Sequence, residues 1–256
     1  MLIYNKKINE KEIIEDITKK PSLKNIEKSF LKRKIKENLT KDKKTLGFLS
    51  KEHSKRSKTY KDFIKEIRRQ ANLAHGMFQK KGKNILETHS STKERLKDYP
   101  YIYKQIFKTT KKPNSIIDLG CGLNPFSLKY TNLKNITYYA YDLDTSLIKK
   151  HLKNVKAKNL DLQIEKNILK LPKADLCLMF KFLDSLEKPK KYTEFIIKNL
   201  KVKFLVISFP LKTLKNKKMT TQKRGWLEQM LKRLKYTHKT FKTDNEIFYI
   251  IKNTSQ

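Results

Sequence analysis

Residues 115–130 read SIIDLGCGLNPFSLKY, in which an apolar run ends in Asp118 and glycines follow at positions 120 and 122. Glycine is scarce elsewhere, with only 6 among 256 residues. Glycines directly after an apolar strand allow the backbone to turn sharply and to approach a ligand closely. This stretch therefore predicts a buried strand whose carboxyl end carries a binding turn.

Strand-like apolar runs alternate with helical periodicities from about residue 85 onward. This alternation predicts a mostly parallel sheet with helices on both faces. A terminal antiparallel hairpin, signalled by TFKTDN at 240–245, completes the pattern of an α/β, class I (Rossmann-like) seven-stranded methyltransferase fold. We expect strands at 115–120, 136–142, 160–165, 175–180, 203–209 and 246–252, and helices at 144–154, 184–200 and 224–235.

Residues 1–84 are predicted to form a small all-helical N-terminal domain ahead of the α/β domain at 85–256. Apolar residues at helical spacing between Leu23 and Leu39, and again between Tyr60 and Ala74, indicate two amphipathic helices. The segment contains 25 Lys and Arg against 10 Asp and Glu, so we expect it to dock onto a large RNA. On this interpretation, its removal would weaken RNA binding and leave cofactor binding intact.

The charge of the whole chain points to a polyanionic partner. It carries 61 Lys and Arg against 25 Asp and Glu, a net charge of +36. Phosphate backbones attract such a surface, although lysine-rich composition also follows from AT-rich codons. Lysine outnumbers arginine 54 to 7, and lysine acts as a point charge for phosphate, whereas arginine dominates base reading. The composition therefore favours recognition of RNA shape and backbone.

Several other classes of protein are not expected. Cys121 and Cys177 lie 56 residues apart, which favours neither a disulfide framework nor a metal site. Cys177 sits inside a predicted apolar strand and is interpreted as a buried core thiol, the alternative being a nucleophile. No apolar run approaches the ~20 residues of a membrane helix, and the start MLIYNKK lacks a secretory signal. We expect a cytoplasmic monomer with no membrane contact.

Two cofactors of nucleotide type fit the glycine turn. The dinucleotide pattern G-x-G-x-x-G requires a third glycine, but Gly120 and Gly122 are followed by Leu-Asn-Pro. Asp142 ends the next apolar strand about 20 residues later, where a carboxylate binds ribose hydroxyls. Asp118 at the end of the first strand would order the loop or its ligand. These features favour S-adenosylmethionine over NAD.

A segment upstream adds a more specific signal. HSSTKERL at 89–96 contains S-x-x-E, which alone is a helix-capping pattern. Followed by the glycine turn, however, it resembles the aminoglycoside-resistance methyltransferases that modify guanine N7 in the decoding site of 16S rRNA (Arm/Rmt type, FmrO-like). The matching pieces continue in the same order through YYAYDLD (138–144), LMFKFLDSLE (178–187), VISFPLKTL (206–214) and NEIFYI (245–250).

The resemblance implies an S-adenosylmethionine pocket and a role for each matching position. Arg95 would bind the methionine carboxylate, Asp142 the ribose, and Asn167 with Ile168 the adenine. Asn167 stands where many members of this fold have an acidic residue. The remaining expected cofactor contacts are Phe78, His89, Ser90, Ser91, Asp118, Gly120, Gly122 and Phe180.

The implied reaction needs no catalytic side chain, because guanine N7 has an exposed lone pair and attacks the methyl group directly. Positioning is then the main task of the protein. The D/N-P-P-Y/F motif of exocyclic-amine methyltransferases does not follow the fourth predicted strand. Candidate contacts to an extruded guanine are Phe182, Phe209, Trp226 and Lys181, with core packing as the alternative for each aromatic residue.

A basic stretch between the strand predicted at 203–209 and the helix predicted at 224–235 is interpreted either as an RNA clamp or as ordinary solvated charge. Its candidate residues are Lys212, Lys215, Lys217, Lys218 and Arg224. The resemblance implies the 30S ribosomal subunit, through its 16S rRNA, as the partner, and drug resistance as the outcome. Two alternatives remain open: a methyltransferase of another RNA or rRNA position, and a non-catalytic RNA-binding or ribosome-assembly protein on the same fold.

Overall fold

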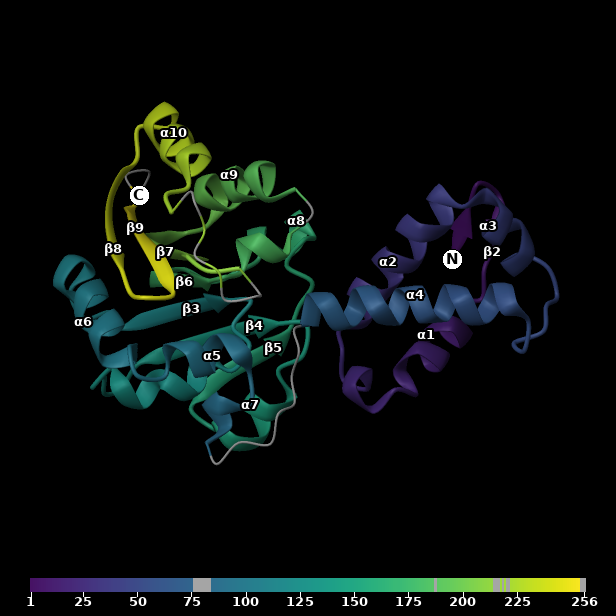
Figure 1. The fold of residues 1–256 in the computed structure, drawn as a ribbon, viewed down its shortest axis with the longest axis horizontal. Coiled ribbons are helices and arrows are strands. Elements are labelled where there is room, and N and C mark those ends of the chain that lie inside the picture. The colour runs from purple at the N-terminus through teal and green to yellow at the C-terminus, as the bar shows by residue number, and fades with distance from the viewer. Residues whose placement is uncertain (76–83, 187, 214–216, 218, 220–221, 254–256) are drawn as a thin grey trace.

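The computed structural model describes residues 1–75, 84–186, 188–213, 217, 219 and 222–253. A helical N-terminal part, residues 1–75, lies at one end of the molecule, and an α/β part, residues 84–253, lies at the other (Figure 1). The long helix α4 (Lys58–His75) runs between them, with its carboxyl end against the α/β part. The predicted division at residue 84 falls beside residues outside the described part and remains a prediction.

A seven-stranded sheet forms the centre of the α/β part, in the order β5-β4-β3-β6-β7-β9-β8. The first five strands in this order are parallel, whereas β9 is antiparallel to both β7 and β8. The predicted fold class and the terminal hairpin are therefore confirmed. The strands are β3 (Ser115–Leu119), β4 (Thr137–Asp142), β5 (Val155–Asn159), β6 (Ala174–Phe180), β7 (Val202–Pro210), β8 (Thr237–Lys242) and β9 (Glu246–Lys252).

The prediction of a strand at 160–165 is wrong, because the third strand of the seven-stranded sheet, in chain order, is β5 at Val155–Asn159. β5 is an edge strand that is buried only at Val155 and otherwise half-buried or exposed, so its sequence VKAKN lacks an apolar run. The apolar Leu160 and Leu162 belong instead to the loop that follows. This shift matters for the site, because it changes which residues come first after the strand.

Helices cover both faces of the sheet (Figure 1). Alternate residues of β6 belong to different apolar clusters: Leu176 and Leu178 pack with α6, and Cys177 and Met179 pack with α9 and α10. Cys177 is thus confirmed as a buried core thiol. The helices are α5 (Ser90–Arg95), α6 (Tyr99–Thr110), α7 (Ser146–His151), α8 (Glu165–Leu169), α9 (Pro189–Asn199) and α10 (Gly225–Arg233).

The N-terminal part has its own apolar core, but it is not all-helical as predicted. A short antiparallel hairpin of two-residue strands, β1 (Leu2–Ile3) and β2 (Lys6–Lys7), precedes the helices. Leu23 lies in a separate 3₁₀ turn, Pro21–Leu23, with the proline in its first position, where its missing N–H is tolerated. The α-helices are α1 (Glu10–Thr18), α2 (Lys28–Lys41), α3 (Lys43–Leu49) and α4.

The amphipathic stripe predicted for α4 is confirmed, since Tyr60, Phe63, Ile64, Ile67 and Ala71 are all buried. Lys61, Lys65 and Arg69 are exposed on its outer side, whereas Arg68 is half-buried and donates to the backbone carbonyls of Asp16 and Ile17 on α1. No helix within the described ranges is both long enough and apolar enough to span a bilayer.

Candidate functional site

A cavity lies at the carboxyl ends of β3, β4 and β6, where the order of the strands reverses. Open α/β sheets bind their ligands at this point. The loop after β5 and the start of α5 complete its walls, and the N-terminal part contributes side chains as well. The lining includes Phe30, Leu73, Ala74, His89, Ser91, Arg95, Asp118, Gly120, Gly122, Asp142, Leu143, Leu160, Asp161, Leu162, Gln163, Phe180 and Phe182.

Two separate observations explain why this turn contains glycine. Gly120 and Gly122 have φ values of +65° and +48°, a backbone conformation that residues with a side chain rarely adopt. In addition, a Cβ on Gly120 would lie 2.3 Å from a ring carbon of Phe182. From the sequence, we expect the missing side chains to let a ligand approach the backbone of the turn. At Gly120 the ring of Phe182 fills this space instead and is thereby fixed in the cavity wall.

Asp142 ties the second strand to this turn. One carboxylate oxygen accepts the backbone N–H of Gly122 at 2.8 Å, and the other accepts that of Leu143 at 2.6 Å. Each carboxylate oxygen has a second lone pair. Asp142 can therefore hold the turn in shape and accept hydroxyl donors from a ligand at the same time.

Asp118 lies at the floor of the cavity and is 1% exposed. Its Oδ2 accepts hydrogen bonds from the Tyr138 hydroxyl at 2.6 Å and from Nδ2 of Asn124 at 2.8 Å. Its Oδ1 has no hydrogen-bond partner among the residues that the structure describes. Burial raises the pKa of Asp118 to about 6, although both of these hydrogen bonds act to lower it. A cationic donor in the cavity would satisfy Oδ1.

Arg95 supplies the opposite charge from α5. Its Nε donates to Glu246 at 2.6 Å, and the two side chains are 3% and 0% exposed. Ser208 donates to the other oxygen of Glu246 at 2.7 Å. The guanidinium also lies over the ring of Phe180, 5.1 Å from its centroid. Its second terminal nitrogen, Nη2, is buried and has no partner within the described ranges, so it can bind an anionic ligand group.

Lys181 is held next to this ion pair and not at the protein surface. It has a φ of +54° directly after β6, and its backbone N–H donates to the carbonyl of Ser208 at 3.2 Å. Its ammonium contacts Glu94 and lies 3.5 Å from Glu246. Two carboxylates therefore offset the charge that the sequence assigned to contacts with the target guanine.

The adenine side of the expected pocket is shifted relative to the prediction. Asn167 and Ile168 lie on α8: Asn167 donates to the backbone carbonyl of Asp161, and Ile168 is 1% exposed within the core. Because β5 ends at Asn159, the loop 160–163 reaches the cavity instead. The resemblance alone had implied Asn167 and Ile168 as adenine contacts.

Of the other expected cofactor contacts, His89 and Ser91 line the cavity, whereas Ser90 is exposed and does not. Phe78 lies outside the described residues. The polar side chains that the sequence analysis missed include Thr92, Asn124, Asp161 and Gln163, which line the cavity, and Tyr138, Ser208 and Glu246, which hold groups that line it. For Glu246 a signal existed, since it is an acidic residue at the head of the otherwise apolar run EIFYII.

The expected target-base contacts separate into two groups. Phe182 lines the cavity. Phe209 is fully buried against Trp226 and Tyr249, so its assignment as a base contact is wrong in this structure: the β7 core takes up its whole surface. Trp226 is half-buried on α10 and packs edge-on against Phe209.

The expected basic clamp is described only in part. Lys217 is exposed and Lys212 half-buried, while Lys215 and Lys218 lie outside the described residues. Arg224 is engaged inside the fold: its guanidinium lies 5.0 Å from the Phe209 ring centroid and 3.7 Å from a carboxylate oxygen of Asp184. No group of three or more His, Cys, Asp or Glu in the described ranges is arranged to hold a metal ion.

The substitution Gly120→Ala is expected to destabilise the protein by about 1–3 kcal/mol, because the backbone conformation is strained for alanine and Phe182 must move. Gly225→Ala is the matched control, since a Cβ there would meet nothing within 4 Å. Urea denaturation measures both. Equal stability of the two variants would contradict the close packing of Phe182 on the turn.

The substitution Asp118→Asn is expected to stabilise the ligand-free protein in a pH-dependent way. Burial raises the pKa of Asp118 from 3.8 to about 6, so the folded protein binds the carboxyl proton more tightly than the unfolded chain does. The stability that this proton contributes is complete below the lower pKa and is lost as the pH rises through the higher one. The variant should therefore gain up to about 3 kcal/mol over the parent above the higher pKa, and nothing below the lower one.

Urea denaturation of the parent and of Asp118→Asn on both sides of this window tests the expectation. Asp62→Asn removes an exposed carboxylate and serves as the control. A difference between parent and Asp118→Asn that is the same at every pH would show that the carboxylate does not pay a desolvation cost.

Comparison with known proteins places the chain in a family. Residues 52–250 match the family model described as ribosomal RNA methyltransferase (FmrO). A 16S rRNA (guanine(1405)-N(7))-methyltransferase of Proteus mirabilis is 36% identical over 138 residues, which is 51% of this chain and 49% of that relative. One of the same name from Serratia marcescens is 29% identical, over 57% of this chain and 60% of the relative. The chain thus aligns with only about half to three-fifths of the length of these relatives.

Solved structures agree with the fold. The 16S rRNA methylase ArmA is 30% identical with a TM-score of 0.54, over 66% of this chain and 89% of ArmA. The 16S rRNA methyltransferase RmtF, solved with S-adenosyl-L-homocysteine, is 19% identical and has a TM-score of 0.73, over 96% of this chain and 98% of RmtF. The family match covers well over half of the residues. The chain belongs to the ribosomal RNA methyltransferase (FmrO) family.

Proposed function

We propose that this protein is an S-adenosylmethionine-dependent methyltransferase that modifies N7 of a guanine in the decoding site of 16S rRNA, on assembled 30S subunits, and so gives aminoglycoside resistance. The observation that carries the proposal is the pair of unsatisfied buried groups in the cavity. Oδ1 of Asp118 is an acceptor and Nη2 of Arg95 a donor, and neither has a partner within the described part of the chain. Such groups are costly unless a ligand completes them.

The methionine end of S-adenosylmethionine fits these groups, because it carries an ammonium and a carboxylate. Asp118 would accept from the ammonium, and Arg95 would donate to the carboxylate. Asp142 would accept from the ribose hydroxyls, as the sequence predicts. The loop 160–163 and Leu143 supply apolar and backbone surface next to the Asp142 carboxylate and would flank the adenine.

When bound, the cofactor supplies a methyl group on a sulfonium, which is strongly electrophilic. The protein's own task is to present guanine N7 in line with it and to exclude water, and no proton has to be removed first. Among Phe182, Phe209 and Trp226, the aromatic residues expected to contact an extruded base, Phe182 lines the cavity and packs on the glycine turn. We assign no general base.

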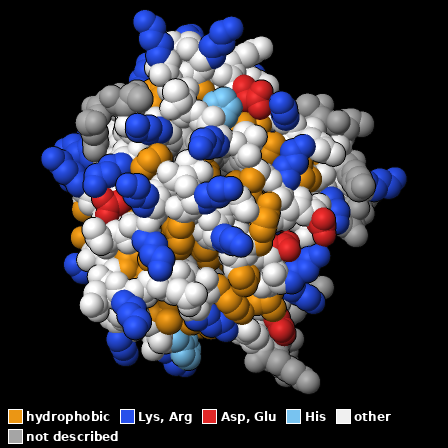
Figure 2. Space-filling view, turned by 90° about the vertical axis from the view of Figure 1, so that its left-hand side faces the viewer, with side chains coloured by type: hydrophobic (Ala, Val, Ile, Leu, Met, Phe, Trp, Pro, Cys, Tyr) orange, Lys and Arg blue, Asp and Glu red, His pale blue; other side chains and the backbone are white. Residues whose placement is uncertain are grey.

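The charge distribution supports an RNA partner. Lys and Arg side chains are spread across the face of the α/β part shown in Figure 2, with few acidic ones between them. A basic concavity also lies between α1 and α4 of the N-terminal part. Its lining includes Lys19, Lys20, Lys61, Lys65, Arg68 and Arg69. We propose that residues 1–84 dock the monomeric enzyme onto the 30S subunit in the cytoplasm.

The test is methyl transfer from labelled S-adenosylmethionine to purified 30S subunits, followed by mapping of the modified base. We expect N7-methylguanine in the decoding site, detected by strand scission after reduction and aniline treatment, and resistance when the gene is expressed in a susceptible bacterium. Methylation elsewhere without resistance would contradict the proposed target. RNA binding without cofactor binding would contradict the enzymatic proposal as a whole.

The substitution Asp142→Asn is expected to weaken cofactor binding at least about tenfold, because an amide replaces a charged acceptor. Binding to 30S subunits should change little. Asp144→Asn, two residues further along, is the matched control, since Asp144 does not line the cavity. Calorimetric titration with S-adenosylhomocysteine measures both; equal affinities would remove Asp142 from the ligand site.

A further inference from the structure

The N-terminal part is attached to the α/β part at the two loops that form the cavity wall. The backbone N–H of Glu27 donates to the carbonyl of Leu143, directly after β4, at 2.7 Å. Nδ2 of Asn159, the last residue of β5, donates to the carbonyl of Asn25 at 2.7 Å. These contacts bring the start of α2 against the same loops that supply Asp142 and residues 160–163 to the cavity.

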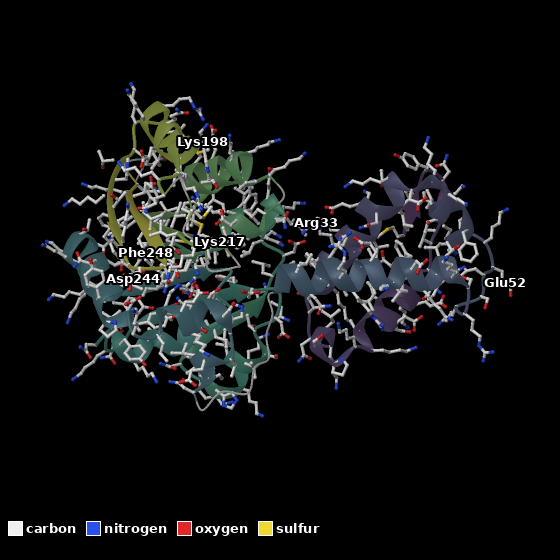
Figure 3. All side chains as sticks on the ribbon, in the orientation of Figure 1. Arg33, Glu52, Lys198, Lys217, Asp244 and Phe248 are labelled. Atoms are coloured by element: carbon white, nitrogen blue, oxygen red, sulfur yellow. The ribbon has the colours of Figure 1, made fainter. Side chains whose placement is uncertain are left out.

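A partly buried ion pair completes this junction. Arg33 of α2 donates to both oxygens of Asp161, from Nε at 2.7 Å and from Nη2 at 3.1 Å, and Figure 3 shows Arg33 where the two parts of the molecule meet. The Asp161 side chain is 1% exposed and that of Arg33 is 19% exposed. Such a two-pronged contact fixes orientation as well as distance. Nη1 of Arg33 also donates to Glu37 on the same helix, at 2.9 Å.

Asp161 in turn organises the loop that lines the cavity. Its Oδ1 accepts the backbone N–H of Gln163 at 3.0 Å, and its backbone carbonyl accepts Nδ2 of Asn167 at 2.8 Å. The position of residues 160–163 therefore depends on where the Asp161 carboxylate is held. The cation that holds it comes from the other part of the molecule, 128 residues earlier in the chain.

The helix that carries Arg33 also contributes directly to the cavity. Phe30 lies three residues earlier on α2, is 1% exposed, and lines the cavity. The Arg33 guanidinium lies over its ring, 5.3 Å from the centroid. Leu73 and Ala74, near the end of α4, line the cavity as well. The N-terminal part therefore provides both a wall of the cavity and the clamp on its neighbouring loop.

We propose that Arg33 is a positioning residue for cofactor binding, and that the basic N-terminal part completes the cofactor pocket in addition to docking RNA. The proposal rests on the assignment of the cavity to S-adenosylmethionine. It departs from the expectation that removal of residues 1–84 leaves cofactor binding intact. Arg33 acts through Asp161, which sets the loop 160–163 against the ligand.

The test is calorimetric titration of the full-length protein with S-adenosylhomocysteine, for the parent and for Arg33→Met, Arg33→Lys and Lys36→Met. Lys36→Met is the matched control, because Lys36 is exposed on the same helix and the substitution removes the same charge. Binding to 30S subunits is measured in parallel. Loss of one charge from α2 should weaken that binding about equally in Arg33→Met and Lys36→Met.

We expect Arg33→Met to bind S-adenosylhomocysteine about tenfold more weakly or worse, the loss seen when groups that orient ligand-binding side chains are removed from metal sites. Lys36→Met should bind like the parent. Arg33→Lys should fall between them, because an ammonium keeps the charge but cannot hold both oxygens of Asp161 in a fixed plane. It also leaves Asp161 paired with a cation, so we expect it to fold even if Arg33→Met does not.

The titration separates positioning from stability, because its stoichiometry reports the folded fraction and its dissociation constant reports the site. A reduced stoichiometry with the parent's dissociation constant in both Arg33 variants would overturn the proposal. So would equal affinities of Arg33→Lys and the parent when Arg33→Met is unfolded. If the parent itself does not bind S-adenosylhomocysteine, the proposed function fails first, and the role of Arg33 fails with it.

Discussion

The ion pair between Arg95 and Glu246 is the interaction on which the site depends. It joins α5 to the first residue of β9 in a setting where both side chains are excluded from solvent. Removing two charges from water is expensive, and apolar replacements of such pairs are often as stable or more so. Glu246 accepts from Nε of the guanidinium, and Nη2 is left without a partner among the described residues. If Nη2 binds the ligand as we propose, that role gives a functional reason for a charged pair here.

Asp118 provides the opposite half of this arrangement from the end of β3. Tyr138 and Asn124 satisfy one of its oxygens and so fix the direction of the carboxylate. A cavity that presents one oriented cation and one oriented anion is complementary to an amino acid and not to a simple phosphate or sugar. The glycine turn and Asp142 add a site for a sugar beside it. On the proposed assignment, these features fit a nucleoside that carries an amino acid with a free ammonium and a free carboxylate, which agrees with the family of the chain.

The parts of this site that could be predicted from sequence are those fixed by local order. The strand–turn unit at 115–122 and the strand ending in Asp142 are recognisable because apolar runs meet glycine or aspartate within a few residues. β5 was not recognisable, because an edge strand with exposed lysines lacks an apolar run. The pairs Arg95–Glu246 and Arg33–Asp161 join residues 151 and 128 positions apart, and only the folded chain brings them together.

The central claim, that the buried charges of the cavity bind the amino-acid part of the cofactor, is tested most directly by comparing two ligands in calorimetry. S-adenosylhomocysteine carries the ammonium and the carboxylate, whereas 5′-methylthioadenosine lacks both and keeps the ribose and adenine. Two charge-assisted contacts predict that the first ligand binds more than about a hundredfold tighter. Equal affinities for the two ligands would show that Asp118 and Arg95 do not face the ligand, and would contradict the account.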